Sequence, residues 1–260
     1  MRVCSAARTP PAAHANTPAH PPLPPPARSD KVKSIVFGGL DGVITTFSIV
    51  AAVAGAQLPI QTALLMGFSN LIADAISMGL GDFLSSKAER EYEVSESKRE
   101  LWEFDNAKEL EVKEQEELFV SKGMTAEDAR EVTATLAKYK DIFHEVHLPA
   151  ELGFSVPDGS DSPAMDGFVT FLSFIVFGSV PMWSYVITYY AGYRYAPGVF
   201  GIACAFTATT LFLLGVTQAA ITKQNRLKTG MLMTLNGGLA AAAAYLIGWG
   251  LELAIGNGVK

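Results

Sequence analysis

The stretch FGGLDGVITTFSIVAAVAG, residues 37–55, decides how this chain is built. It is almost wholly apolar, and the run from Ile35 to Ala56 has the length of about 20 residues that a transmembrane helix needs. It also holds one carboxylate, Asp41, between glycines. A charge at that depth is costly unless it faces protein, water or an ion. The stretch therefore predicts a membrane-spanning helix. In it, Asp41 is either an ion-pathway ligand or a group that lies near the headgroups or caps a neighbouring helix.

Four further apolar runs predict four further membrane helices, so the expected fold is an all-α membrane protein with five transmembrane helices. Pro181 is expected to kink the third span. Small residues let helix backbones approach closely, so Gly237, Gly238 and the alanine run 240–244 of the last span predict close helix contacts. The four runs are residues 60–84, 165–190, 198–222 and 230–255.

The second apolar run carries a polar stripe with a spacing of four residues: Asn70, Asp74, Met78 and Asp82. On a helix this spacing keeps the side chains on one slowly turning face. Asp74 lies near mid-span and is a candidate ion ligand. Met78 is either a soft ligand or a side chain that fills a packing gap, and Asp82 is either part of the stripe or interfacial.

Charge divides the chain into an apolar body and an acidic insert. Residues 87–163 hold 20 of the 26 acidic and 10 of the 20 basic residues, so this insert has a net charge of −10 and the remainder a net charge of +4. Nucleic-acid binding needs a basic surface, so this function class is excluded. The expected divisions are a disordered Pro-rich tail (1–29), helices one and two (30–86), a helical insert (87–163) and helices three to five (164–260).

The insert contains glutamates in helical register. Glu89, Glu93, Glu96, Glu100 and Glu103 are spaced four, three, four and three residues apart, which places them on one helix face. Glu111 and Glu114 form a second pair. Such oxygen-rich clusters suit hard or borderline divalent cations, although an ordinary solvated helix gives the same pattern.

Two histidines lie close together in the segment His144-Glu145-Val146-His147. Their spacing is one residue short of the zinc-protease helix motif, which needs histidines four residues apart. They are weak candidates for a metal site. Thr125 is expected to cap a helix with Asp128 at its third position, and Pro149 is expected to interrupt a later short helix.

Basic residues near the ends of the spans predict the orientation, because they favour the cytosolic side. With five spans, the N-terminus and the acidic insert are expected in the cytosol. Arg194 and Lys260 would lie on the other side, and the cytosolic set is Arg28, Lys31, Lys33, Lys87, Arg90, Lys223, Arg226 and Lys228.

Three segments closely resemble the vacuolar iron transporter family. They are residues 38–47 (GGLDGVITTF), residues 73–82 (ADAISMGLGD) and the sequence Glu100-Leu101-Trp102-Glu103 followed by Glu111 and Glu114. The resemblance extends from about residue 31 to the C-terminus. It implies five transmembrane helices, a homodimer, and a cytosolic helical metal-binding domain between helices two and three.

The resemblance also implies the site residues. Asp41 and Met78 match the translocation path, to which the polar stripe adds Asp74 and Asn70. Asn70 stands where some relatives have a carboxylate. Five glutamates match the metal-binding domain, and His147 stands where adjacent methionines are expected, so it joins that set. The glutamates are Glu100, Glu103, Glu111, Glu114 and Glu151.

The expected function is therefore proton-coupled transport of ferrous iron, and of manganese, from the cytosol into the vacuole or another acidic store, for iron storage and detoxification. Zn²⁺ and Co²⁺ are further candidate substrates, H⁺ is the counter-ion, and no prosthetic group and no enzyme activity are expected. The rivals are a membrane-bound di-metal carboxylate enzyme that uses Glu100/Glu103 and Glu111/Glu114, and a metal sensor without transport. Di-iron bundles use Glu-x-x-His pairs, which this sequence does not contain.

Overall fold

The computed structural model describes residues 27–157, 162–192 and 198–258, and within these ranges all regular structure is helical. The predicted disordered tail lies outside the described residues, apart from residues 27–29, which belong to the first helix. The helices are α1 (Ala27–Gly55), α2 (Ile60–Asn106), α3 (Lys108–Ser121), α4 (Ala126–Leu136), α5 (Lys140–Glu151), α6 (Pro163–Gly178), α7 (Val180–Tyr190), α8 (Val199–Ile221) and α9 (Arg226–Gly258).

Four of these helices, α1, α2, α8 and α9, are long and apolar enough to cross a membrane. The pair α6 and α7 passes the same test if it forms one span, bent by 45° at Ser179. The break lies two residues before Pro181, so the predicted kink is confirmed. The described residues thus contain four or five candidate spans, in agreement with a polytopic α-helical membrane protein.

Helix α1 lies at the centre of the membrane body, in contact with α2, α6, α7, α8 and α9. Its Phe47, Val50 and Ala51 form a buried core with Met182 of α7 and Ala203 of α8. Helix α9 lies at the edge, and most of its apolar stretch is exposed. Leucines that remain exposed on the outer helices suit contact with lipid rather than water.

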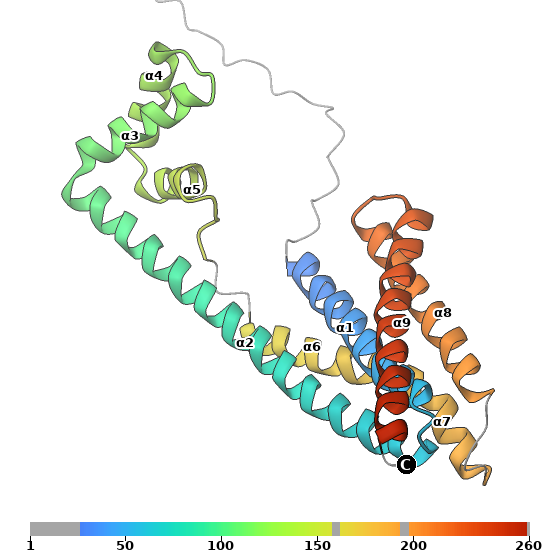
Figure 1. Cartoon of the computed structure of the whole chain (residues 1–260). Helices are drawn as coiled ribbons and strands as arrows, with labels where there is room; N and C mark the ends of the chain where they lie inside the picture. Colours follow the sequence, from blue (N-terminus) through green and yellow to red (C-terminus); the bar gives the residue numbers. More distant parts are fainter. Residues whose placement is uncertain (1–26, 158–161, 193–197, 259–260) are drawn as a thin grey trace, which may run out of the picture.

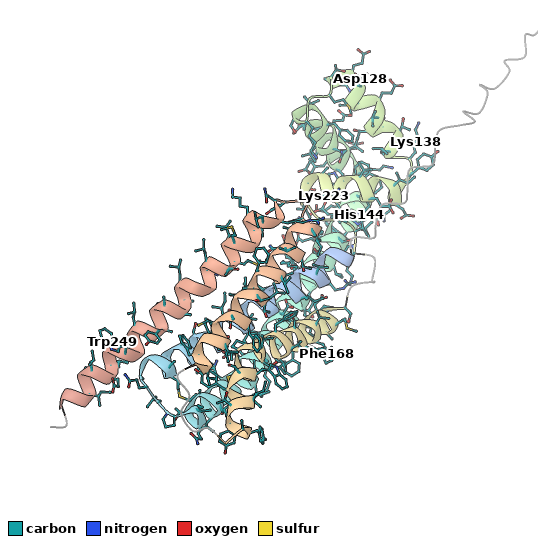
Figure 2. The ribbon with its side chains drawn as sticks, turned by 90° about the vertical axis from the view of Figure 1, so that its right-hand side faces the viewer. Asp128, Lys138, His144, Phe168, Lys223 and Trp249 are labelled. Carbon is teal, nitrogen blue, oxygen red and sulfur yellow. The ribbon has the colours of Figure 1, made fainter. Side chains whose placement is uncertain are left out.

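Helix α2 is one continuous helix of 47 residues, which is about 70 Å at 1.5 Å per residue. The predicted boundary between membrane segment and insert, at residues 86 and 87, falls inside it without a break. Figure 1 shows α2 running from the membrane body to the insert, where α3, α4 and α5 gather at its far end. The view turned by 90° in Figure 2 shows Asp128 and Lys138 of the insert far from Trp249 of α9. The insert and the membrane helices therefore share one structural element.

The insert has a small apolar core, in which Phe104 of α2 packs on Phe143 of α5 with ring centroids 4.8 Å apart. The predicted cap of α4 is confirmed, since Thr125 Oγ1 accepts a hydrogen bond from the Asp128 backbone N–H at 3.2 Å. The predicted interruption at Pro149 is wrong. Helix α5 continues through this residue, because a proline near the end of a helix removes only one backbone hydrogen bond.

Asp82, the last residue of the polar stripe, joins three helices. Its Oδ2 accepts hydrogen bonds from Ser34 Oγ of α1 at 3.3 Å and from Thr170 Oγ1 of α6 at 2.5 Å. A half-buried carboxylate between two hydroxyl donors is satisfied without a cation. This junction holds α2 against α1 and α6 on the side where α2 leaves the membrane body.

Close helix contacts use glycines at specific positions. A Cβ on Gly79 of α2 would lie 2.8 Å from Phe171 Cβ and 2.9 Å from Gly167 O, both in α6. The close contacts expected of Gly237, Gly238 and the alanine run 240–244 are confirmed for Gly237 and for Ala241, which is buried in the core around Phe47, but not for Gly238. Gly237 packs against Leu211 of α8, whereas Gly238 is exposed and a Cβ on it would have no neighbour within 4 Å.

We expect Gly79→Val to destabilise the protein by about 1–3 kcal/mol, because the added side chain must push α2 and α6 apart. Thermal unfolding of the detergent-solubilised protein measures the effect. Gly81→Val is the matched control, since a Cβ at Gly81 has no neighbour within 4 Å. Equal effects of the two substitutions would contradict the α2–α6 contact.

Candidate metal site

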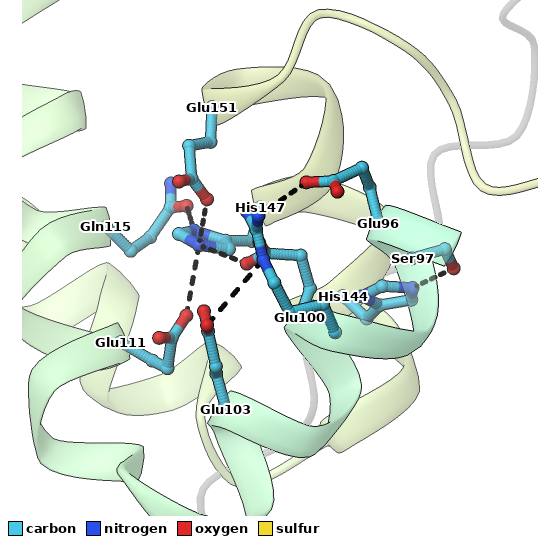
Figure 3. Close-up of polar contacts among 10 residues, drawn as sticks. Glu96, Ser97, Glu100, Glu103, Glu111, Gln115, His144, His147 and Glu151 are labelled. Carbon is cyan, nitrogen blue, oxygen red and sulfur yellow. Dashed lines mark hydrogen bonds and ion pairs between the residues drawn. The ribbon is translucent and has the colours of Figure 1, made fainter. Parts of the chain in front are cut away.

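Three carboxylates and one imidazole converge inside the insert from three helices. His147 Nε2 of α5 lies 2.9 Å from Glu151 Oε2, 3.2 Å from Glu111 Oε2 of α3 and 3.6 Å from Glu100 Oε2 of α2. Figure 3 shows these side chains pointing toward one another. His147, Glu100 and Glu111 are 2–3% exposed and Glu151 is half-buried, so water screens this cluster only weakly.

The tautomer of His147 follows from its second nitrogen. Nδ1 lies 2.7 Å from Gln115 Oε1, and this contact is a hydrogen bond in the tautomer in which Nδ1 carries the proton and donates. Burial is the largest cause that lowers the pKa of His147, which keeps the ring neutral. The Nε2 lone pair therefore faces three carboxylates and makes no hydrogen bond. Only a proton or a cation between these groups makes the arrangement favourable.

Two carboxylates of the cluster, Glu111 and Glu151, hold protons unusually strongly. Burial, followed by the charges of Glu100, Glu103 and Glu114, raises the pKa of Glu111 to about 7. Burial, followed by the charges of Glu100 and Glu114, likewise raises the pKa of Glu151 to about 7. Like charges that are forced together out of water take up protons or cations to relieve their repulsion. The cluster can therefore exchange protons for a metal ion near neutral pH.

A second group of potential ligands adjoins the first. Glu100, Glu103 and Glu111 each offer one oxygen within 4.8 Å of the others, as do Glu100, His147 and Glu151 in the first group. Glu100 belongs to both groups. Oxygen ligands suit Mn²⁺ and other hard cations, and an added imidazole nitrogen suits the borderline ions Fe²⁺ and Zn²⁺. The donor set therefore fits divalent transition metals.

The structure separates the sequence candidates of the insert into two classes. Glu100, Glu103, Glu111, Glu151 and His147 come together, but Glu114 lies exposed on α3 and belongs to neither group. The charge of Glu114 still acts on Glu111 and Glu151.

The other histidine and two further polar residues complete the surroundings of the cluster. His144 Nε2 lies 2.9 Å from Ser97 Oγ, and His144 is in neither ligand group. Sequence reasoning missed Ser97 and Gln115. The spacing of four residues from Glu111 to Gln115 places them on one face of α3, and this was the available signal for Gln115.

The membrane candidates form a separate polar region. Asn70 Nδ2 donates a hydrogen bond to Asp74 Oδ2 at 2.5 Å, both on α2, and Asp41 of α1 is half-buried. Met78 packs against the buried cluster of Leu71, Ala75 and Phe174. Met78 and Glu100 are about 33 Å apart along the continuous helix α2. The same helix thus carries residues of both polar regions.

Comparison with known proteins identifies the family. The family model described as "VIT family" matches residues 32–249. The chain belongs to the VIT family. The "Vacuolar iron transporter" of Toxoplasma gondii is 38% identical over 231 residues, 88% of this chain and 76% of the relative. The protein of the same name from Plasmodium falciparum is 36% identical, over 84% of this chain and 81% of the relative.

A more distant relative, "Vacuolar iron transporter 1" of Tulipa gesneriana, is 28% identical over 84% of this chain and 85% of its own. The resemblance drawn from the motifs is therefore confirmed. The VIT relatives are named as transporters, in agreement with the expectation that the chain is not an enzyme.

The pKa values of Glu111 and Glu151 predict a pH-dependent metal affinity. Both carboxyls are ionised at pH 8 and mostly protonated at pH 6, since their pKa is about 7. Burial lowers the pKa of His147, so above the usual pKa range of an imidazole this side chain carries no proton that competes with the metal. Metal must displace these protons, so we expect Mn²⁺ affinity to fall at least about tenfold from pH 8 to pH 6. Calorimetric titration of the full chain at both pH values measures this change.

Glu111→Gln should weaken Mn²⁺ binding and flatten its pH dependence. Glu117→Gln is the matched control, because it removes a carboxylate from an exposed position on the same helix, outside both ligand groups and not among the charges that raise the pKa of Glu111 or Glu151. We expect a smaller loss of affinity and an unchanged pH profile for the control. A flat profile in the unaltered chain would contradict proton displacement at this cluster.

Proposed function

We propose that this protein transports ferrous iron, and also manganese, across a membrane in exchange for protons. The observation that carries the proposal is the neutral His147 Nε2 among the buried Glu100 and Glu111 and the half-buried Glu151. These residues lie on an insert built around the same helix that carries the stripe of Asn70, Asp74 and Met78. Relatives named vacuolar iron transporters support the choice of iron.

The insert would collect the metal ion. Its glutamates concentrate cations near the surface through a net charge of −10. The buried cluster would then hold an ion that has lost part of its water shell, with His147 Nε2 and carboxylate oxygens as ligands. Protons released from Glu111 and Glu151 would leave as the ion enters.

The membrane path would use Asp41, Asp74, Asn70 and Met78. Two carboxylates balance the charge of one divalent ion, and carboxylates buried in a membrane domain mark ion and proton pathways. A thioether is a soft ligand that favours iron over harder ions. Protons arriving from an acidic compartment would compete for the carboxylates and release the ion there.

The direction proposed is from the cytosol into the vacuole or another acidic store, with the N-terminus and the insert cytosolic. The excess of basic residues at one set of span ends supports this orientation, and the names of the relatives support the compartment. In intact vacuoles, protease added outside should cut the insert. Protection of the insert there would contradict the proposed direction.

We further propose a homodimer with the ion path at or near its two-fold axis. A single five-helix subunit offers little enclosed volume for an ion path, and Gly238 lies on an open face of α9, where a small residue permits close approach of another helix. Cross-linking in membranes should give a dimer, and a Gly238→Leu variant should give less of it. A product that is monomeric throughout would refute the dimer.

Asp41→Asn tests the path, because it removes the charge at nearly constant size. We expect this variant to fold, to bind Mn²⁺ at the insert as before, and to lose at least about 90% of iron uptake into sealed vesicles with an acidic interior. Met78→Ala should lose more iron uptake than manganese uptake, since it removes only a soft ligand.

Glu252→Gln is the control for this assay, because Glu252 is an exposed carboxylate of α9, and we expect near-normal uptake. Full uptake by Asp41→Asn would overturn the proposed path. Metal binding by the unaltered chain without any uptake would favour the rival function, a sensor that does not transport.

A further inference from the structure

Arg99 supplies a positive charge within the glutamate cluster. Its guanidinium lies 2.8 Å from Glu96 Oε2, 3.0 Å from Glu100 Oε1 and 3.6 Å from Glu103 Oε1, all on α2. The guanidinium therefore contacts two of the three carboxylates of the second ligand group, Glu100, Glu103 and Glu111.

The two oxygens of Glu100 have different partners. Oε2 faces His147 Nε2 in the first group, and Oε1 accepts a hydrogen bond from Arg99 Nη2. Glu103 also directs its Oε1 toward Arg99. A metal ion in the second group needs oxygens of these same carboxylates. A bound guanidinium and a bound divalent cation at this place would repel each other.

The side chain of Arg99 is free to move away. It is 49% exposed, compared with 2% for Glu100. Glu96 is in neither ligand group, and its contact with Arg99 is the shortest of the three. The guanidinium can thus stay paired with Glu96 while it leaves Glu100 and Glu103.

We propose that Arg99 is a tethered counter-ion that occupies the Glu100–Glu103 side of the cluster until a divalent metal ion displaces it toward Glu96 and solvent. The proposal rests on the insert being a metal-binding site, as stated under Proposed function. Arg99 would lower the affinity of the second group and so set the metal concentration at which the insert fills. It would act on affinity without being a ligand.

Calorimetric titration of the full chain in detergent with Mn²⁺, at pH 7.5 and low salt, tests this proposal. We expect Arg99→Gln to bind Mn²⁺ about tenfold more tightly, because one competing charge has been removed next to the site. The matched control is Arg130→Gln. It removes the same charge from the insert at a residue 77% exposed and 4.0 Å from Glu116, outside both ligand groups.

A second variant tests the resting place of the guanidinium. Glu96→Gln leaves Arg99 with only Glu100 and Glu103 as partners, so we expect Mn²⁺ binding to weaken about threefold. In the Arg99→Gln background the same change should have a smaller effect, since no guanidinium remains to be displaced.

Unchanged or weaker binding by Arg99→Gln would overturn the proposal, because Arg99 would then position the carboxylates rather than compete for them. Equal losses from Glu96→Gln in both backgrounds would also contradict it. If the unaltered chain binds no Mn²⁺, the metal site itself is refuted and the role of Arg99 falls with it. Failure of the inference alone is thus distinguished from failure of the proposed function.

Discussion

The buried negative charge around His147 Nε2 is the constraint on which the insert depends. Glu100, Glu111 and Glu151 lie within 3.6 Å of a nitrogen whose lone pair is also an acceptor. Burying such groups without a partner is strongly unfavourable. Helices α2, α3 and α5 nevertheless hold them together, with Gln115 and Phe143 fixing the imidazole. A cation bound there, as proposed, would relieve this unfavourable arrangement and would link folding of the insert to metal occupancy.

The continuity of α2 gives this local chemistry a fixed place relative to the membrane. No glycine or proline lies between Asp82 and Asn106, so nothing in the sequence favours a hinge. Asp82 holds the helix against α1 and α6 through Ser34 and Thr170. The distance from the polar stripe to the insert cluster is therefore set by helix geometry. Along α2, Glu100 of the cluster lies about 33 Å from the level of Met78.

Sequence reasoning recovered features that depend on nearby residues. Apolar run length gave the membrane helices, Pro181 gave the bend between α6 and α7, and Thr125 gave the cap of α4. It could not separate Glu111 from Glu114. Both fit the helix register, but only the packing of α5 on α3 decides which one is buried.

The same limit applies to other contacts between distant segments. Gly237 and Gly238 are indistinguishable until α8 is placed beside one of them. Sequence reasoning also missed that α2 is one unbroken helix. The change from apolar to charged residues was interpreted as a domain boundary, although the helix continues through it. Local patterns predict elements, whereas the faces that those elements bury are decided by segments far away in the sequence.

The two polar regions share a further property. In each of them, a neighbouring side chain already donates a hydrogen bond to a carboxylate oxygen. In the insert, Arg99 contacts Glu100 Oε1, and in the membrane body Asn70 donates to Asp74 Oδ2. The two donors differ in charge. A guanidinium neutralises a carboxylate and repels an incoming cation, whereas an amide only satisfies one lone pair. On the proposed path, Asn70 adds a ligand without a charge, so Asp41 and Asp74 would be the two carboxylates that match the charge of one divalent ion. A carboxylate at position 70 would add a third negative charge, which a proton would have to balance.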